Sequence, residues 1–203
     1  MSEQCAKGYT AFCGTRCLAS GDLPSVATKV KEALDHEGPE SVLIFDDQNG
    51  EVQEVDLRGT IEDILKRLDL PAPTVDLTEA SENSGPNALR GPGRPKLGVV
   101  AREVTLLPRH WDWLNSQPGG ASVALRRLVD EARHTNSARD RVRHSQESAY
   151  RFMSAVAGNL PGYEEALRAI FAGNRKHFDD STGAWPADTR GYALKLAEAA
   201  FHD

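Results

Sequence analysis

The sequence predicts an α+β protein with a small N-terminal ββαββα domain, a linker, a central strand–helix–helix unit and C-terminal helices. Three observations support this fold class. Strand and helix patterns alternate up to residue 70, a stretch rich in proline and glycine follows at 71–98, and apolar residues then recur at helical spacing. The expected segments are therefore 1–70, 71–98, 99–136 and 137–203.

The first segment contains clear start and turn signals for its strands and helices. Residues 8–21, GYTAFCGTRCLASG, predict two short strands around a tight glycine turn. An amphipathic helix, LPSVATKVKEALDH, follows, with Asp22 as its expected N-cap. SVLIFDD then predicts a buried strand, DQNGE a hairpin turn and VQEVDL the returning partner strand. Thr60 and Asp63 open a last helix, TIEDILKRL, in the spacing of a capping box.

Two features of this segment raise the question of a metal or redox site. Cys13 and Cys17 lie across the first hairpin loop, where they could face one another, but two further zinc ligands at suitable spacing do not follow. The acidic cluster around the second turn could bind a cation, although the Asp-rich pattern of a calcium loop is absent. That cluster consists of Asp46, Asp47, Glu51, Glu54 and Asp56. We interpret the thiols as half-buried and the turn carboxylates as solvated, and we predict no metal and no cofactor.

The composition is that of a soluble cytoplasmic protein. The N-terminus MSEQCAKGYT lacks the apolar core of a signal peptide, and no apolar run is long enough to span a bilayer. Three cysteines, an odd number, provide no disulfide framework and favour a reducing compartment. We therefore expect a cytoplasmic location and no membrane contact.

Charge is unevenly distributed along the chain. Residues 1–89 carry 7 Lys/Arg against 17 Asp/Glu, whereas residues 90–144 carry 11 against 5. Residues 145–203 carry 6 against 8, and the whole chain has a net charge of −6. A basic middle between acidic ends is typical of a segment that faces nucleic acid, and mutual neutralisation within or between subunits is the alternative.

The linker ends in a basic arm. Residues 90–96 read RGPGRPK and are similar to the Gly-Arg-Pro core of the AT-hook, an extended segment that lies in the narrow minor groove. The match is partial, because proline stands where that motif has arginine before the glycine, and plain linkers also contain such strings. If the arm contacts phosphates, Arg94 and Lys96 provide the charge.

The central segment predicts a strand, two helices and a glycine turn. Residues 100–106 form the expected strand, and Pro108 begins a helix that extends to Ser116. Pro118-Gly119-Gly120 ends it, and Ser122 is the expected N-cap of a second helix over 123–133.

This order resembles the ribbon-helix-helix DNA-binding fold. In that fold two chains pair their strands into a ribbon that enters the major groove, and the second helix presents its N-terminus to a phosphate. The resemblance implies a homodimer on double-stranded DNA. The positions that match its DNA-facing residues, together with cationic positions on the second helix, are Arg102, Thr105, Ser122, Val123, Arg126 and Arg127.

The strand departs from the pattern of a DNA-reading ribbon. With Val104 and Leu106 inward, the outward residues are Glu103, Thr105 and Leu107. Only Thr105 is a conventional base reader, and a carboxylate among phosphates is usually repelled. Arg102 faces outward only in the opposite phase, which buries Thr105 and Glu103.

A protein-interaction role is the alternative to DNA binding. Trp111 and Trp113 are two residues apart and cannot share one helix face, which favours a partner surface for one of them. The central segment would then be a helical hairpin in a dimer or in a complex with another protein.

The C-terminal third predicts helices and no catalytic constellation. One helix ends at Gly158, one starts after Pro161, and Pro186 starts the last. Basic residues continue along the first of these helices, at Arg139, Arg141, Arg143 and His144. Because the usual hydrolase, zinc-protease and phosphate-loop motifs are absent, we expect a non-enzymatic protein without a small-molecule substrate.

The chain as a whole resembles a bacterial family known only as domain of unknown function 2239. The strings that carry the resemblance include YTAFCG, VLIFDD, DLRGT, GRPKLGVVAREVTLLPRHWDWLNSQPGGASVALRRLVDEAR, AYRFMSAVAG and AWPADTR. The resemblance implies a bacterial source and one full-length unit, and it brings no assigned activity and no established catalytic residues. From the residues themselves, our first hypothesis is a dimeric, non-enzymatic DNA-binding protein that acts as a transcriptional regulator.

Overall fold

The computed structural model describes residues 7–37, 41–69, 100 and 102–201. The chain divides into two compact units, of which the larger combines residues 1–70 with 136–203 and the smaller comprises residues 71–135. The larger unit thus joins the N-terminal segment to the C-terminal third. No described helix combines the length and apolar character needed to cross a membrane.

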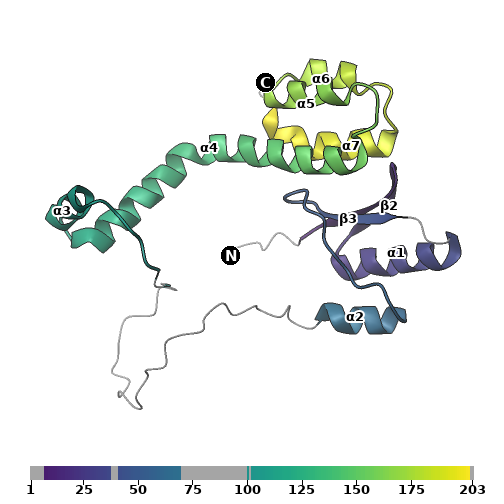
Figure 1. The fold of residues 1–203 in the computed structure, drawn as a ribbon, viewed down its shortest axis with the longest axis horizontal. Coiled ribbons are helices and arrows are strands. Elements are labelled where there is room, and N and C mark those ends of the chain that lie inside the picture. The colour runs from purple at the N-terminus through teal and green to yellow at the C-terminus, as the bar shows by residue number, and fades with distance from the viewer. Residues whose placement is uncertain (1–6, 38–40, 70–99, 101, 202–203) are drawn as a thin grey trace, which may run out of the picture. The chain divides into compact units, whose positions relative to one another are not determined.

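The larger unit is built on a three-stranded antiparallel sheet, in agreement with the predicted α+β class (Figure 1). Its central strand β1 (Tyr9–Cys13) pairs with β2 (Arg16–Gly21) on one side and with β3 (Val42–Asp46) on the other. The predicted first hairpin is therefore confirmed, and its turn contains Gly14 with a φ of 55°.

Helices cover both faces of this sheet, since α1 (Leu23–Glu37) and the C-terminal helices lie on opposite sides (Figure 1). Tyr9 and Ala11 share a hydrophobic cluster with Val26 and Val30 of α1. Phe12, on the alternate face of β1, belongs to a second cluster with the C-terminal helices. Alternate residues of a strand point to opposite faces, so one short strand contributes to two cores.

The predicted start signals of both N-terminal helices are confirmed. The backbone N–H of Ser25 donates to Asp22 Oδ1 at 2.9 Å, which makes Asp22 the cap of α1. At α2 (Ile61–Asp69), the Asp63 N–H donates to the Thr60 hydroxyl at 3.2 Å and the Thr60 N–H donates to the Asp63 carboxylate at 3.0 Å. These reciprocal bonds satisfy two backbone donors at the helix start.

The predicted fourth strand, VQEVDL, is wrong. Only Val52 forms a bridge, to Phe45, and the Gln53 N–H donates to the Ile44 carbonyl at 2.7 Å. The chain then leaves the sheet, because Val55 and Leu57 pack against the cluster under α1. Burial of these two side chains thus replaces further strand pairing, and the observed order is ββαβα.

The C-terminal part of the larger unit is helical. It contains the end of α4 (Gly120–Val156), followed by α5 (Tyr163–Phe171), α6 (Arg175–Ser181), α7 (Ala187–Ala197) and a short 3-10 helix at Glu198–Ala200. The segment after Pro161 forms two helices instead of one. Gly173, with a φ of 66°, interrupts it, and Asn174 caps α6 by accepting from the His177 N–H at 3.0 Å.

Four aromatic rings form the centre of the larger core. Phe152 of α4 lies 5.0 Å from Phe12, 5.1 Å from Phe45 and 4.6 Å from Tyr192 of α7, measured between ring centroids. Phe12, Phe45 and Phe152 are at most 1% exposed. This cluster joins the sheet to helices more than a hundred residues away in the chain, so the two form one folding unit.

The two hairpin cysteines do not face one another. Cys13 is opposite Arg16 and Cys17 is opposite Phe12, which places the two thiols on different faces of the hairpin. Both are partly buried, as our interpretation expected. Among the described residues there is no group of three or more His, Cys, Asp or Glu side chains placed to hold a metal ion.

The smaller unit has a helix, a turn and the start of a long helix, but its predicted strand is not formed. Residues 102–107 have no strand pairing with any described segment. The first helix, α3 (Pro108–Ser116), has the predicted bounds, with Pro108 at its first position. A ribbon strand is defined by a second strand beside it, and no described residue of this chain supplies one.

The second predicted helix is longer than expected. It is α4, which begins at Gly120 and continues to Val156, beyond the predicted end at residue 133. Between residues 121 and 156 the chain contains no glycine or proline to end it. Ser122 is therefore in the first turn of the helix, and the predicted N-cap role of this residue is wrong.

Candidate functional site

An apolar groove lies among the described residues of the smaller unit. It has a volume of about 290 Å³, and it lies between the segment before α3, α3 itself and the first turns of α4. Its lining residues are Leu106, His110, Trp113, Leu114, Leu125 and Leu128. Leu114 and Ala124 are the only buried apolar residues among those described in this unit. Apart from Leu114, the side chains that line the groove are therefore only partly covered by the unit or are exposed.

Large apolar side chains are exposed around this groove. Trp113 is 49% exposed, and Val104 and Val129 are each more than half exposed. Short helices gain most of their stability from tertiary packing of an apolar face. With so few buried side chains, the helices of this unit gain little of that packing from a single chain.

The predicted DNA-facing residues fall into three groups. Four of them, Ser122, Val123, Arg126 and Arg127, lie on the first two turns of α4, and all four are exposed. Arg102 and Thr105 are exposed on the segment before α3, and no hydrogen bond or ion pair between described residues joins them to α4. Arg94 and Lys96 lie outside the described residues.

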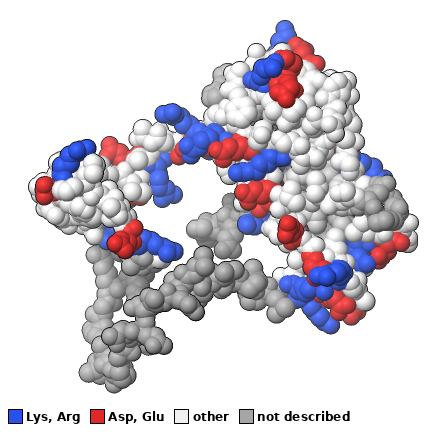
Figure 2. Space-filling model, viewed as in Figure 1, with Lys and Arg blue, Asp and Glu red and all other residues white. Residues whose placement is uncertain are grey.

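The arginines of the two units differ in whether they form ion pairs. In the larger unit most arginines contact a carboxylate, and these are Arg58, Arg67, Arg143, Arg151, Arg168, Arg175 and Arg190. In the smaller unit no described arginine forms an ion pair with a described carboxylate. These are Arg102, Arg109, Arg126, Arg127 and Arg133. Figure 2 shows, in blue, where lysine and arginine side chains reach the visible surface. Unpaired guanidinium groups remain available for an external anion.

The order of charges along α4 helps to explain this difference. Asp130 and Glu131 follow Arg126 and Arg127 at four-residue spacing. A helical ion pair is weaker when the basic residue precedes the acidic one, because both charges then oppose the helix dipole. Binding of Arg126 and Arg127 to an external anion therefore gives up little ion-pair energy within the helix.

In the larger unit, Asp47 connects the end of β3 to α7. Its Oδ1 accepts from the Thr10 hydroxyl at 2.7 Å and from the Tyr192 hydroxyl at 2.8 Å, and its Oδ2 contacts Lys195 Nζ at 2.7 Å. The neighbouring Asp46 is only 7% exposed and accepts from the Gln48 N–H. Our interpretation of these two carboxylates as solvated turn residues was therefore wrong.

Burial and the Asp47 carboxylate both raise the pKa of Tyr192, since each disfavours a phenolate. We expect Tyr192→Phe to lower the free energy of unfolding at pH 8 by about 1.5 kcal/mol, because it removes a hydrogen bond to a charged acceptor. Because the pKa is raised in the folded state, the wild-type protein loses stability as the pH rises above about 10, where the unfolded tyrosine ionises. Tyr192→Phe removes that loss. Urea unfolding at several pH values measures both effects.

Tyr150→Phe is the matched control, because Tyr150 is 47% exposed and has no hydrogen bond from its hydroxyl to a described residue. This variant keeps the wild-type stability at pH 8. An alkaline loss of stability that is as steep in Tyr192→Phe as in the wild type would contradict the assignment.

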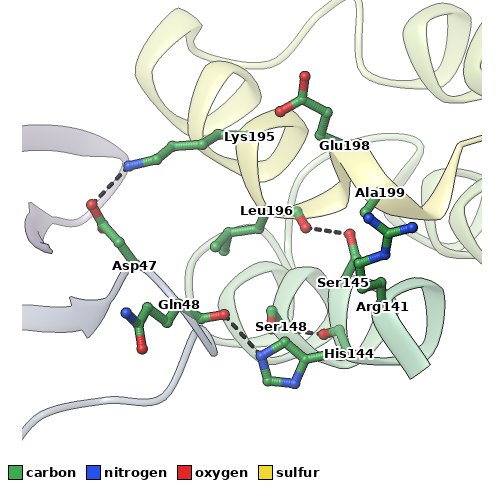
Figure 3. A pocket seen from close by; sticks show the side chains of 10 residues that line it. All are labelled: Asp47, Gln48, Arg141, His144, Ser145, Ser148, Lys195, Leu196, Glu198 and Ala199. Atoms are coloured by element: carbon green, nitrogen blue, oxygen red, sulfur yellow. Dashed lines mark hydrogen bonds and ion pairs between the residues drawn. The ribbon is translucent and has the colours of Figure 1, made fainter. Parts of the chain in front are cut away.

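A cleft lies beside Asp47 between three parts of the larger unit (Figure 3). It has a volume of about 380 Å³, and its walls come from the turn after β3, from α4 and from the end of α7 with the residues that follow. The lining residues are Asp47, Gln48, Arg141, His144, Ser145, Ser148, Lys195, Leu196, Glu198 and Ala199. His144 Nε2 lies 3.0 Å from the Gln48 carbonyl oxygen, and this contact closes the lower wall in Figure 3.

No sequence pattern predicted this cleft. Arg141 and His144 stand out in the sequence only as part of a basic stretch, and neither Lys195 nor Ser145 belongs to a recognisable motif. No local signal marks the site, because the hydrogen bond between Ser145 and the Leu196 carbonyl joins residues 51 positions apart.

Residues 8–197 match the family described as an uncharacterized protein conserved in bacteria, DUF2239. The chain belongs to the DUF2239 family. No curated protein and no solved structure matches it. The match covers both units of this DUF2239 chain, including the cleft residues up to Leu196 and the whole of the smaller unit.

Proposed function

We propose that this protein is a homodimeric, non-enzymatic DNA-binding protein that acts as a transcriptional regulator through its smaller unit. The observation that carries the proposal is the set of arginines in that unit that pair with no described carboxylate, among them Arg126 and Arg127 near the start of α4. Exposed cations without a carboxylate partner suit the phosphates of a duplex, where their binding releases counterions.

The start of α4 supports a phosphate contact at the same place. The first backbone N–H groups of a helix lack internal partners and point outward, and the helix dipole adds positive potential there. The Gly120 N–H donates to the Gln117 carbonyl, and the amides of Ala121 and Ser122, in the first turn, have no acceptor within the helix. The exposed Ser122 hydroxyl adds a further donor. Arg126 follows Ser122 by one helical turn, so amide, hydroxyl and guanidinium donors share one side of the helix.

Dimerisation explains the exposed apolar groove. In the proposed dimer, residues 102–106 of two chains pair as an antiparallel ribbon, and the apolar faces around Leu106, Trp113 and Leu128 pack against their copies. Pairing would satisfy backbone groups of residues 102–106 and bury side chains that are exposed in one chain.

We expect the full chain to bind duplex DNA with two chains per duplex and with a strong dependence on salt. Arg126→Gln together with Arg127→Gln should weaken binding on all sequences, because each substitution removes a positive charge from a phosphate. The slope of log K against log salt should become shallower by about 0.9 for each phosphate that is no longer neutralised. Fluorescence anisotropy with genomic fragments at several salt concentrations measures this, and analytical ultracentrifugation gives the stoichiometry.

Arg168→Gln is the matched control, because Arg168 is an exposed arginine of the larger unit whose charge is paired with Glu165. That variant binds DNA as the wild type does. Absence of binding at low salt would refute the proposal. A stable dimer without DNA binding would instead favour the second candidate, a dimerisation or protein-interaction module, which the exposed Trp113 and the apolar groove also support.

A further inference from the structure

The cleft of the larger unit is lined by equal numbers of acidic residues and of lysine and arginine residues, but their charges are not evenly compensated. Asp47 is fully occupied by Thr10, Tyr192 and Lys195, so its negative charge is already neutralised inside the fold. Glu198 is exposed, and Figure 3 shows its carboxylate apart from Arg141 and His144. Neither acid therefore compensates the positive charge on the α4 side of the cleft.

Arg141 is the cation on that side. It lines the cleft from α4, and its side chain forms no ion pair or hydrogen bond with any described residue. Its guanidinium lies near the wall formed by Ser145 and Ala199 (Figure 3). An arginine with five free N–H donors at the edge of a concave site is suited to a carboxylate or a phosphate group.

The middle of the cleft is apolar and the far end is polar. Leu196 lies between Arg141 and Lys195 in Figure 3, and Ala199 lines the wall beside Arg141. The ammonium group of Lys195 uses one donor on Asp47 and keeps others for a second polar group. The Ser145 and Ser148 hydroxyls donate to the carbonyls of Leu196 and His144, respectively, and these hydrogen bonds fix the orientation of both side chains.

We propose that this cleft binds a small organic anion, with its carboxylate or phosphate group on Arg141 and its carbon skeleton on Leu196 and Ala199. The volume of about 380 Å³ lies at the small end of the range of ligand sites, about 300–1,000 Å³. A small molecule is therefore favoured over a nucleotide or a peptide. The site belongs entirely to the larger unit, and the inference does not depend on the proposed DNA binding.

The walls of this cleft distinguish it from the other hollows on α4. Those hollows are lined by residues of α4 alone, over 137–147, and are gaps between side chains of one exposed helix. The cleft at Arg141 combines segments near residues 47, 145 and 196, as expected for a preformed ligand site.

The test uses the full chain with three probes: inorganic phosphate, succinate and glycerol 3-phosphate. At millimolar concentrations, at least one probe should shift the backbone amide signals of Ser145, Ser148 and Leu196 in two-dimensional NMR spectra. Arg141→Gln should weaken that binding about tenfold, since it removes a charge-assisted bidentate contact. Stronger binding of succinate identifies a carboxylate ligand, and stronger binding of glycerol 3-phosphate identifies a phosphate monoester.

Arg139→Gln is the control, because Arg139 is an exposed arginine of the same helix that does not line the cleft. This variant should bind the probe with wild-type affinity, and circular dichroism should show both variants folded. Binding by none of the probes, or equal weakening in both variants, overturns the proposal. So does an Arg141→Gln variant that loses DNA affinity while it binds the probe as the wild type does.

Discussion

Replacing Phe152 by alanine is expected to lower the free energy of unfolding by about 3–5 kcal/mol, the range for a large buried side chain whose cavity cannot close. Phe152 is fully buried and contacts three other aromatic rings, on β1, β3 and α7. The sheet and the C-terminal helices share these contacts, so the variant should loosen both together. Urea unfolding followed by circular dichroism measures the change.

Phe171→Ala is the control for this variant, because Phe171 is 56% exposed at the end of α5. We expect it to change stability by less than about 1 kcal/mol. If Phe152→Ala produced two separate transitions, with only the helical signal shifted, the shared core would be disproved. A single transition at lower urea concentration agrees with one cooperative unit.

Replacing Gly50 by alanine is expected to cost about 3 kcal/mol, because it combines backbone strain with a collision. Gly50 has a φ of 67°, which L-residues adopt at a cost of about 1–2 kcal/mol. A Cβ at this position would lie 2.3 Å from the Ser148 carbonyl oxygen, which belongs to the backbone of α4 and cannot rotate away. The turn after β3 would have to move off α4. Thermal and urea unfolding measure the loss.

Gly14→Ala separates the two contributions to this cost. Gly14 has a similar φ of 55°, but a Cβ there would meet no atom within 4 Å. Its alanine variant should therefore lose only the backbone part, about 1–2 kcal/mol. Equal losses at both positions would show that Gly50 is needed for its conformation alone and that the turn does not press against α4.

The candidate sites differ in how much of them sequence reasoning predicts. The residues of the smaller unit lie close together in sequence. The proline, glycine and apolar spacing therefore predicted the bounds of α3 correctly, and it placed Ser122, Val123 and Arg126 together near a helix start. The proposed ribbon would need a second chain, so the structure of a single chain does not test it. The cleft depends on three distant segments, and no spacing rule connects Asp47, Arg141 and Lys195.

The fold shows the same division between local and distant causes. The Asp22 cap and the Thr60–Asp63 capping box were predicted correctly, because each involves backbone and side-chain groups within three residues. The fourth strand was predicted from an alternating pattern and a good turn. It did not form because burial of Val55 and Leu57 under α1 competes with further pairing.

Local sequence patterns were enough to predict the α+β fold class, most of the helix starts, the first hairpin and the basic character of the middle of the chain. These properties follow from neighbouring residues and from periodicity. The core shared by the N-terminal sheet and the C-terminal helices, and the cleft beside Asp47, emerge only in the folded chain. Both depend on contacts across about a hundred residues or more, and such contacts are selected by the packing of complementary surfaces, which no local pattern encodes.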